Sequence, residues 1–182
     1  MLLDTPICDF GWQAPDFTLS DPNGRSFTMK DHLGEKGLLI AFICNHCPYV
    51  KAIGERLATD TRELMAEGIN VLAIMSNDYR LVPDDSPENM LRFADAYRFP
   101  FPYLVDEGQA VGKAYGAVCT PDFFGLNREG ALQYRGRLDD ARMGQSEGRT
   151  RELVNAMRRI AETGHGPVDQ IASMGCSIKW SA

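Results

Sequence analysis

Two cysteines separated by two residues, Cys44 and Cys47, are the groups of this chain best suited to chemistry. This spacing lets the two sulfur atoms meet, so that one thiolate can attack a substrate disulfide and the other can resolve the mixed disulfide. His46 lies between them, where its ring can add positive charge or hydrogen bonds to a thiolate. Cys44-Asn45-His46-Cys47 is therefore the first candidate for an active site.

The motif lies between a predicted buried strand and a predicted helix. Residues 37–43 are almost all apolar, which is typical of a strand buried on both faces. A helix is predicted over 49–67, where apolar residues recur at three- and four-residue steps before Gly68. The first amides of a helix lack partners and its dipole favours an anion. A thiolate at this point should therefore have a pKa below the ordinary ~8.5.

The rest of the chain predicts alternating strands and helices. A hairpin is expected over 16–29, because turn-forming residues occupy positions 21–24. Further along we expect a strand at 70–75, a helix from Ser86 to about Arg98, a strand at 103–105, a helix at 109–115, strands at 122–126 and 131–134, and a helix at 147–163. These elements predict an α/β fold in which helices flank a mixed β-sheet. Residues 1–182 form one predicted domain, with 164–182 as an irregular C-terminal tail.

Composition and charge exclude several classes of protein. The chain has 182 residues, of which 44% are hydrophobic and 24% charged, so one packed domain is expected. The net charge of −6 argues against binding to nucleic acid or to anionic membranes. No apolar run approaches the ~18 residues of a membrane span, and the N-terminus lacks the basic segment of a secretory signal. We therefore expect a cytoplasmic protein without nucleic-acid or membrane partners.

The cysteine count leaves two other interpretations of the motif open. Five cysteines, an odd number, argue against a disulfide framework. The motif could be a buried pair without a task, or Cys44, His46 and Cys47 could bind a metal such as copper(I) or zinc. Structural zinc usually takes four ligands, and the remaining candidates Cys119 and Cys176 are isolated. Disulfide exchange requires neither an organic cofactor nor a metal, so none is expected.

Several segments resemble a known family. APDFTLSDPNG at 14–24, FICNHCPYV at 42–50 and TPDFF at 120–124 resemble the redoxin (AhpC/TSA) branch of the thioredoxin superfamily. YRGRLDD at 134–140 and GCSIKW at 175–180 are similar to a peroxiredoxin-like subgroup of that branch. The resemblance covers nearly the whole chain. It implies a thioredoxin fold with an N-terminal β-hairpin and an insertion after the second core strand.

The resemblance also implies a thiol–disulfide oxidoreductase and a role for each site residue. Cys44 would be the nucleophile and Cys47 the resolving thiol. Pro121 matches the proline that is cis in this fold, and Thr120 would offer its backbone to an extended substrate chain as to an added strand. The implied partners are protein or small-molecule thiols and disulfides, together with a reducing thiol partner.

Two positions depart from the thioredoxin pattern. Many thioredoxins carry a tryptophan directly before the first cysteine, and this chain has Ile43. They also carry a buried acid six residues before that cysteine, where this chain has Leu38. The acid normally helps to move the proton of the buried thiol. His46 is the candidate for that task here.

A peroxiredoxin-like peroxidase is the alternative enzyme, with Cys47 as its reactive cysteine because a proline follows that residue. Peroxiredoxins shape their peroxide pocket with a threonine or serine three residues earlier and a proline seven residues earlier. Cys44 and Ile40 occupy these positions, and Thr120-Pro121 stands where an activating arginine is expected. Since fast peroxide reduction depends on polarising the O–O bond, we expect this reaction to be slow.

The remaining candidates receive structural interpretations. Cys119 is expected to pack in the core, and Cys8 to be incidental near an unstructured N-terminus. Cys176 fits a tail anchor and an additional resolving thiol equally well. Two groups of charged residues are expected in exposed or solvated loops. They are Arg135, Arg137, Asp139 and Asp140 after the last strand, and Asp78, Asp84 and Asp85 before the second helix.

Overall fold

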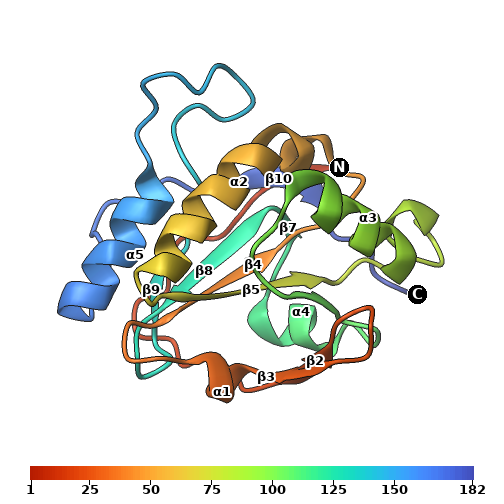
Figure 1. The fold of residues 1–182 in the computed structure, drawn as a ribbon, viewed down its shortest axis with the longest axis horizontal. Helices are drawn as coiled ribbons and strands as arrows, with labels where there is room; N and C mark the ends of the chain where they lie inside the picture. The colour runs from red at the N-terminus through yellow and green to blue at the C-terminus, as the bar shows by residue number, and fades with distance from the viewer.

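The computed structural model describes residues 1–182, which fold around a central mixed β-sheet (Figure 1). Its strands are β2 (Thr18–Ser20), β3 (Ser26–Thr28), β4 (Leu38–Phe42), β5 (Asn70–Met75), β6 (Tyr103–Val105), β8 (Asp122–Leu126) and β9 (Leu132–Tyr134). The helices are α1 (Met29–His32), α2 (Pro48–Ala66), α3 (Pro87–Tyr97), α4 (Ala110–Tyr115) and α5 (Glu152–Thr163), with a 3₁₀ turn η1 (Pro83–Asp85). The seven strands lie in the order β3-β2-β6-β5-β4-β8-β9.

Strand β4, which leads into the motif, lies at the centre of this sheet. It runs parallel to β5 and antiparallel to β8, and β5 in turn runs parallel to β6. All five of its residues are buried, as its apolar run predicted. The motif therefore leaves the sheet from its most constrained strand.

Helices cover both faces of the sheet. Successive side chains of a strand point to opposite faces, and β4 supplies both cores in this way. Leu39 and Ala41 pack in one core with residues of α2, α3 and α5. Leu38 and Ile40 pack in a second core with Tyr115 of α4. Figure 1 shows α2 and α5 side by side on one face and α4 on the other.

The two helices nearest the motif begin where the sequence predicts. Helix α2 has Cys47 as its N-cap and Pro48 at its first position, where the missing N–H costs no hydrogen bond. Helix α3 is capped by Ser86, whose Oγ accepts a hydrogen bond from the N–H of Asn89 at 3.3 Å.

A second, three-stranded sheet contradicts two predictions about the chain ends. It consists of β1 (Leu2–Asp4), β10 (Met174–Ser177) and β7 (Cys119–Thr120), with β10 in the middle and both pairings antiparallel. The prediction of an irregular tail over 164–182 is therefore wrong for 174–177, and the N-terminus is not unstructured. These segments are too short and too mixed in polarity to be predicted as strands. Their pairing depends on contacts that are distant in sequence.

Helix α5 is shorter than predicted. It begins at Glu152 rather than at residue 147, because Gly148 takes a φ of +71° that a helix does not allow. The next segment is held instead by ion pairs, in which the guanidinium groups of Arg149 and Arg151 bind the buried carboxylate of Asp60. Side-chain charge pairing therefore replaces the first turn of the expected helix.

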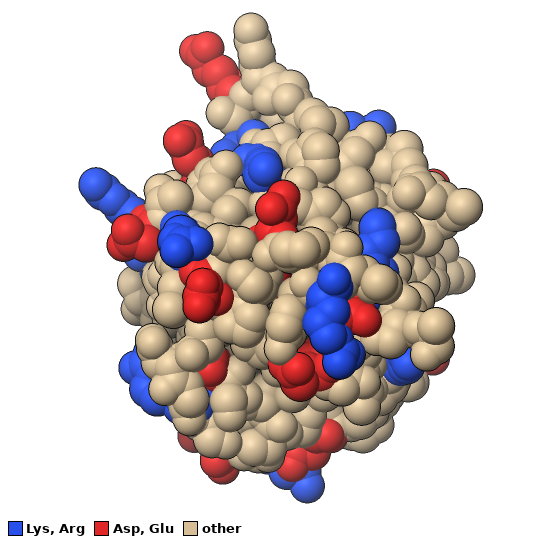
Figure 2. Space-filling model, turned by 90° about the vertical axis from the view of Figure 1, so that its right-hand side faces the viewer, with Lys and Arg blue, Asp and Glu red and all other residues tan.

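The surface view in Figure 2 shows lysine and arginine side chains interspersed with aspartate and glutamate. On this face, over α3 and the C-terminus, uncharged surface separates the charged groups, and no continuous basic stripe crosses it. No helix combines the length and apolar character that crossing a membrane requires.

Candidate active site

The two sulfur atoms of the motif are buried at the junction of β4 and α2. Cys44 follows the strand and is 1% exposed, while Cys47 caps the helix and is fully buried. All five cysteines of the chain are free thiols. The structure therefore describes the reduced form of the pair.

Thr120, the residue before Pro121, contacts the sulfurs of both motif cysteines. The Thr120–Pro121 peptide bond is cis. The Thr120 hydroxyl Oγ1 lies 3.2 Å from Cys44 Sγ, and Cys47 Sγ lies 3.4 Å from the Thr120 carbonyl oxygen. Both sulfurs thus contact a single residue that is more than seventy positions away in sequence.

His46 is held by a carboxylate that the sequence analysis placed in a solvated loop. Its Nδ1 lies 2.5 Å from Oδ2 of Asp85, and Asp85 is fully buried. The other oxygen of Asp85 accepts hydrogen bonds from the backbone N–H groups of Asn45 and His46. The side chain of Asn77 donates a further bond at 2.9 Å. Asp85 therefore fixes both the backbone and the histidine of the motif.

This pairing fixes the charge next to the cysteines. The hydrogen bond to Asp85 raises the pKa of His46 above its ordinary value. Burial alone would raise the pKa of Asp85, but the hydrogen bonds from His46 and Asn77 outweigh it and lower that pKa. An imidazolium beside a carboxylate is the favoured state, and the positive ring lies close enough to interact with the Cys47 thiolate.

Asn45, the remaining residue of the motif, is also fixed from both sides. The hydroxyl of Tyr103 donates a hydrogen bond to its side-chain oxygen at 2.9 Å. Its side-chain nitrogen donates to the carbonyl of Asp84 at 3.1 Å. The whole loop from Cys44 to Cys47 is thus attached to β6 and η1, which holds the two thiols in place.

The two thiols have opposite acidities. A hydrogen bond from the thiol of Cys44 lowers the pKa of Cys47 to about 4, aided by the thiol and backbone N–H of Cys176 and by the N–H of Val50. The same shared hydrogen bond raises the pKa of Cys44, and burial and the carboxylate of Asp85 raise it further. The position of Cys47 at the N-terminus of α2 acts in the same direction. These opposite pKa shifts favour a negative charge on Cys47 and a proton on Cys44 in the reduced site.

The family is decided by the match of a sequence profile. The profile described as the AhpC/TSA family matches residues 10–135, which include the motif, Thr120 and Pro121. This chain belongs to the AhpC/TSA family. The resemblance described from the sequence is therefore confirmed.

Two kinds of known redox protein are similar to this AhpC/TSA chain in sequence. The thiol-disulfide oxidoreductase ResA of Halalkalibacterium halodurans is 27% identical over 71% of this chain and 69% of its own length. A provisionally named peroxiredoxin of Mycobacterium tuberculosis is 24% identical over 85% of this chain and 88% of its own length. Both comparisons place the chain among thiol-dependent redox proteins.

A solved structure confirms the fold over almost the whole chain. A hypothetical protein from Sinorhizobium meliloti 1021 is 40% identical, covers 98% of each chain and aligns with a TM-score of 0.91. More distant solved structures of thioredoxin-type oxidoreductases share the same fold. The AhpC/TSA chain therefore has the predicted thioredoxin fold.

The AhpC/TSA site contains one group that could hold a metal. The ligand atoms of Cys44, His46 and Asp85 lie within 4.8 Å of one another. However, the two carboxylate oxygens of Asp85 already accept four hydrogen bonds. A metal would have to displace these donors, so the arrangement favours thiol chemistry over metal binding.

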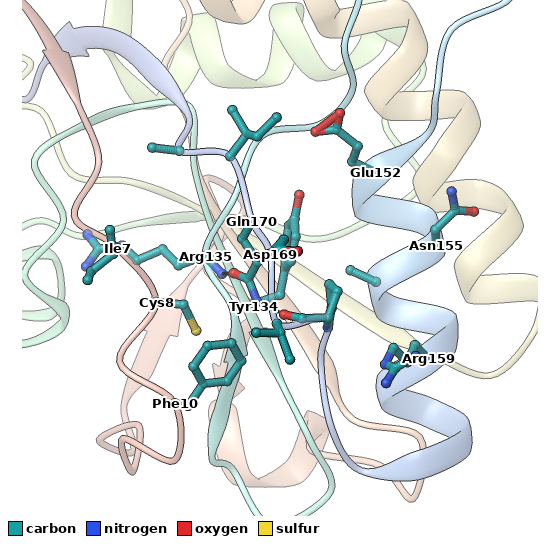
Figure 3. Close-up of a pocket in the computed structure, with 15 residues that line it drawn as sticks. Ile7, Cys8, Phe10, Tyr134, Arg135, Glu152, Asn155, Arg159, Asp169 and Gln170 are labelled. Carbon is teal, nitrogen blue, oxygen red and sulfur yellow. Dashed lines mark hydrogen bonds between the residues drawn. The ribbon is translucent and has the colours of Figure 1, made fainter.

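Two hollows of the AhpC/TSA protein differ in their position relative to the motif. One, of about 390 Å³, is lined by Pro121, by Tyr49 of α2 and by Met174 of β10, which are neighbours of the motif residues in the chain or the fold. The other, of about 750 Å³, lies between the N-terminal segment, α5 and the segment 167–172, away from both cysteines of the motif (Figure 3). Only the first hollow adjoins the candidate active site.

Two charged side chains that were expected in an exposed loop, those of Arg135 and Asp139, are buried instead. Arg135 is only 8% exposed and donates two hydrogen bonds to the fully buried carboxylate of Asp122. Asp139 is buried beneath the side chains of Arg56 and Arg149. The burial was not predicted, because it depends on ion pairs between segments that are distant in sequence.

The sequence analysis did not connect Asp85 or Tyr103 with the motif, and it left Cys176 open between a tail anchor and an additional resolving thiol. Asp85 and Tyr103 contact the motif, and Cys176 lies beside Cys47. The capping sequence at Ser86 places Asp85 at the edge of a helix, but nothing local indicates that its side chain turns inward. Cys8 is a partly buried thiol and Cys119 a buried one, and burial raises their pKa values to about 11 and about 12.

Proposed function

We propose that this protein is a thiol–disulfide oxidoreductase that works by dithiol–disulfide exchange at Cys44 and Cys47. The observation that carries the proposal is the contact of both sulfurs with Thr120, together with the stabilised thiolate on Cys47. The similarity to ResA supports the same activity. Exchange needs only these two thiols and their substrate.

The charge distribution supports an order of steps opposite to the one the resemblance implied. The Cys47 thiolate attacks one sulfur of a substrate disulfide, a Cys47–substrate bond forms, and the first substrate thiolate leaves with the proton of Cys44. The Cys44 thiolate then attacks the sulfur of Cys47 and releases the second substrate thiolate. The dithiol is oxidised and the substrate disulfide is reduced to two thiols. The same steps run in reverse when a substrate dithiol is oxidised.

His46 and Asp85 would position and polarise the motif during these steps. The imidazolium stabilises the thiolate of Cys47, which favours the reduced form and makes the pair more oxidising. Thr120 Oγ1 is placed to hydrogen-bond the Cys44 thiolate once that residue has given up its proton. Pro121 lines the adjoining hollow through which a substrate sulfur would approach.

The substrates would be protein or small-molecule disulfides and thiols, and a thiol partner would restore the reduced form. The hollow beside Pro121, of about 390 Å³, falls within the range of roughly 300–1,000 Å³ found for small-molecule pockets. The cytoplasmic location expected from the sequence stays a prediction, which cell fractionation would test.

The experiment begins with fully reduced protein and an equal amount of glutathione disulfide, followed by mass spectrometry of tryptic peptides. We expect a Cys44–Cys47 bridge and release of two equivalents of glutathione per chain. The Cys44→Ser/Cys47→Ser double variant should not react in this way, whereas Cys119→Ser should behave like the unaltered protein. Failure of the unaltered protein to form the bridge, or equal reaction of the double variant, would overturn the proposal.

The thiolate on Cys47 also favours a second candidate, a thiol peroxidase in which Cys47 attacks peroxide. Low pKa values are characteristic of reactive cysteines, and the provisionally named peroxiredoxin is a relative. Ile40 and Cys44 still occupy the positions of the peroxide pocket. Stopped-flow oxidation by hydrogen peroxide distinguishes the two, because fast loss of Cys47 thiolate as a sulfenic acid supports the peroxidase.

A further inference from the structure

The backbone that a substrate chain was expected to pair with already has a partner. Residue Cys176 of β10 lies opposite Thr120 in an antiparallel register, and Ser177 lies opposite Cys119. Thr120 was the residue expected to offer its backbone to an extended substrate. The C-terminal strand therefore occupies the place of that substrate strand.

The approach of β10 to this backbone is unusually close. A Cβ atom on Gly175 would lie 1.7 Å from the carbonyl oxygen of Thr120 and 3.1 Å from the nitrogen of Pro121. Only a glycine allows the strand to lie this near the cis peptide. The segment is therefore fitted to the site rather than resting loosely on it.

The strand carries its own thiol to the reactive sulfur. Cys176 is paired with Thr120, the residue whose carbonyl oxygen lies 3.4 Å from the sulfur of Cys47, and its thiol and backbone N–H help to lower the pKa of Cys47. The Cys176 side chain is partly buried and packs against the same core cluster as Cys44 and Cys47. Cys119, which lies opposite Ser177 in the same pair of strands, is fully buried and makes no hydrogen bond to either sulfur of the motif.

We propose that Cys176 is a third redox thiol of this site and resolves a mixed disulfide on Cys47 in competition with Cys44. The proposal rests on the proposed function, which supplies the substrate disulfide. The Cys176 sulfur attacks the sulfur of Cys47, a Cys47–Cys176 bond forms, and the bond to the substrate sulfur breaks. The thiol of Cys176 is oxidised, and the substrate leaves as a thiol that takes up the proton of Cys176.

Two resolving thiols approach Cys47 from different elements. Cys44 comes from the motif loop after β4, and Cys176 comes from β10. In the reduced protein, burial and the neighbouring Cys47 thiolate raise the pKa of Cys176 to about 11, so it stays protonated. A mixed disulfide removes the negative charge of Cys47 and with it one cause of that raised pKa. Cys176 thus becomes a better nucleophile only after Cys47 has reacted.

The Cys44→Ser variant isolates this step. It is treated with glutathione disulfide, and the disulfides are mapped on tryptic peptides under acidic conditions. Cys47 lies in the tryptic peptide 37–51 and Cys176 in the peptide 160–179, so their bond joins two peptides. We expect this cross-linked product and about tenfold less glutathione on Cys47 than in the Cys44→Ser/Cys176→Ser variant. The Cys44→Ser/Cys119→Ser variant is the matched control and should cross-link like Cys44→Ser.

A second variant keeps every thiol. Gly175→Ala adds a Cβ that clashes with Thr120, so β10 must move away from the cis peptide. In the Cys44→Ser background it should decrease the cross-link and increase glutathione on Cys47. Stable glutathione on Cys47 in Cys44→Ser, with Cys176 left as a free thiol, overturns the third-thiol proposal. Absence of a Cys44–Cys47 bridge in the unaltered protein instead overturns the proposed function, so the two failures are distinguishable.

Discussion

The Oδ2 atom of the buried Asp85 lies 2.5 Å from Nδ1 of His46, within the short turn between the two cysteines. The two residues are 39 positions apart in sequence, and their pairing crosses from η1 to the motif. Thioredoxins of the usual pattern keep a buried acid in the preceding strand, a position that Leu38 fills here. A buried carboxylate is thus present at the site, but it comes from η1 rather than from strand β4.

The pairing makes stability depend on pH. The pKa of His46 is raised above its ordinary 6.5, and that of Asp85 is lowered below its ordinary 3.8. The contribution of the pair is therefore fully present between pH 3.8 and 6.5 and is lost as the pH rises through the folded pKa of His46. It is also lost as the pH falls through the folded pKa of Asp85. Urea unfolding of His46→Asn should show the largest deficit inside that window, with His165→Asn, a substitution at an exposed histidine, as the matched control.

Cys47 should react as a thiolate in acid. Alkylation by iodoacetamide, mapped by mass spectrometry across pH, should give Cys47 an apparent pKa of about 4. Replacing Cys44 by alanine removes the donor that contributes most to this value, so the apparent pKa of Cys47 should rise. Cys47→Ser should remove the acidic reaction altogether. A reactive group of low pKa that persists in Cys47→Ser would show that Cys44 carries the charge instead.

Thr120→Val tests the hydroxyl beside Cys44. The hydrogen bond from Thr120 lowers the pKa of Cys44, so its loss should disfavour the Cys44 thiolate. A hydrogen bond of about 1 kcal/mol corresponds to a roughly fivefold slower formation of the Cys44–Cys47 bridge from the mixed disulfide. Quenched-flow mass spectrometry measures this step. Thr18→Val removes an exposed hydroxyl pair with Thr28 and should leave the rate unchanged.

Arg135→Met should destabilise the fold strongly. It leaves Asp122, which is fully buried and whose pKa burial already raises, without its partner. Breaking a buried ion pair by removing one partner costs about 3–5 kcal/mol, which urea unfolding would measure. Arg25→Met breaks a pair whose arginine side chain is 74% exposed, and its cost should stay within about 1 kcal/mol. Equal effects of the two substitutions would contradict this account.

The sequence predicts well those elements whose signals are local. The apolar run before Cys44, Pro48 at the start of α2 and the Ser86 cap of α3 each specify structure within a few residues. For that reason the strand–motif–helix unit is predicted from sequence and confirmed by the structure, whereas the thioredoxin fold is implied by the resemblance to the redoxin branch and is confirmed by the solved structures.

The neighbours of the sulfurs are less predictable because their roles arise from distant contacts. Asp85 has an acidic neighbour and a helix start beside it, which is also the pattern of a solvated loop. Its burial depends on donors from Asn45, His46 and Asn77. Cys176 lies in a segment with a glycine and no alternation, so no local pattern predicts its pairing with Thr120. Side chains that meet across long sequence separations carry no signature in a single chain.

The small sheet of β1, β10 and β7 has a consequence for how the site opens. It holds its three segments by few backbone bonds, such as that from the N–H of Ser177 to the carbonyl of Met1 at 2.8 Å. Segments with few bonds and few buried contacts open at lower free energy than the central sheet around β4. Amide hydrogens of 174–177 should therefore exchange with solvent well before those of 38–42. A local opening of the chain ends then exposes the sulfurs, while the rest of the fold stays intact.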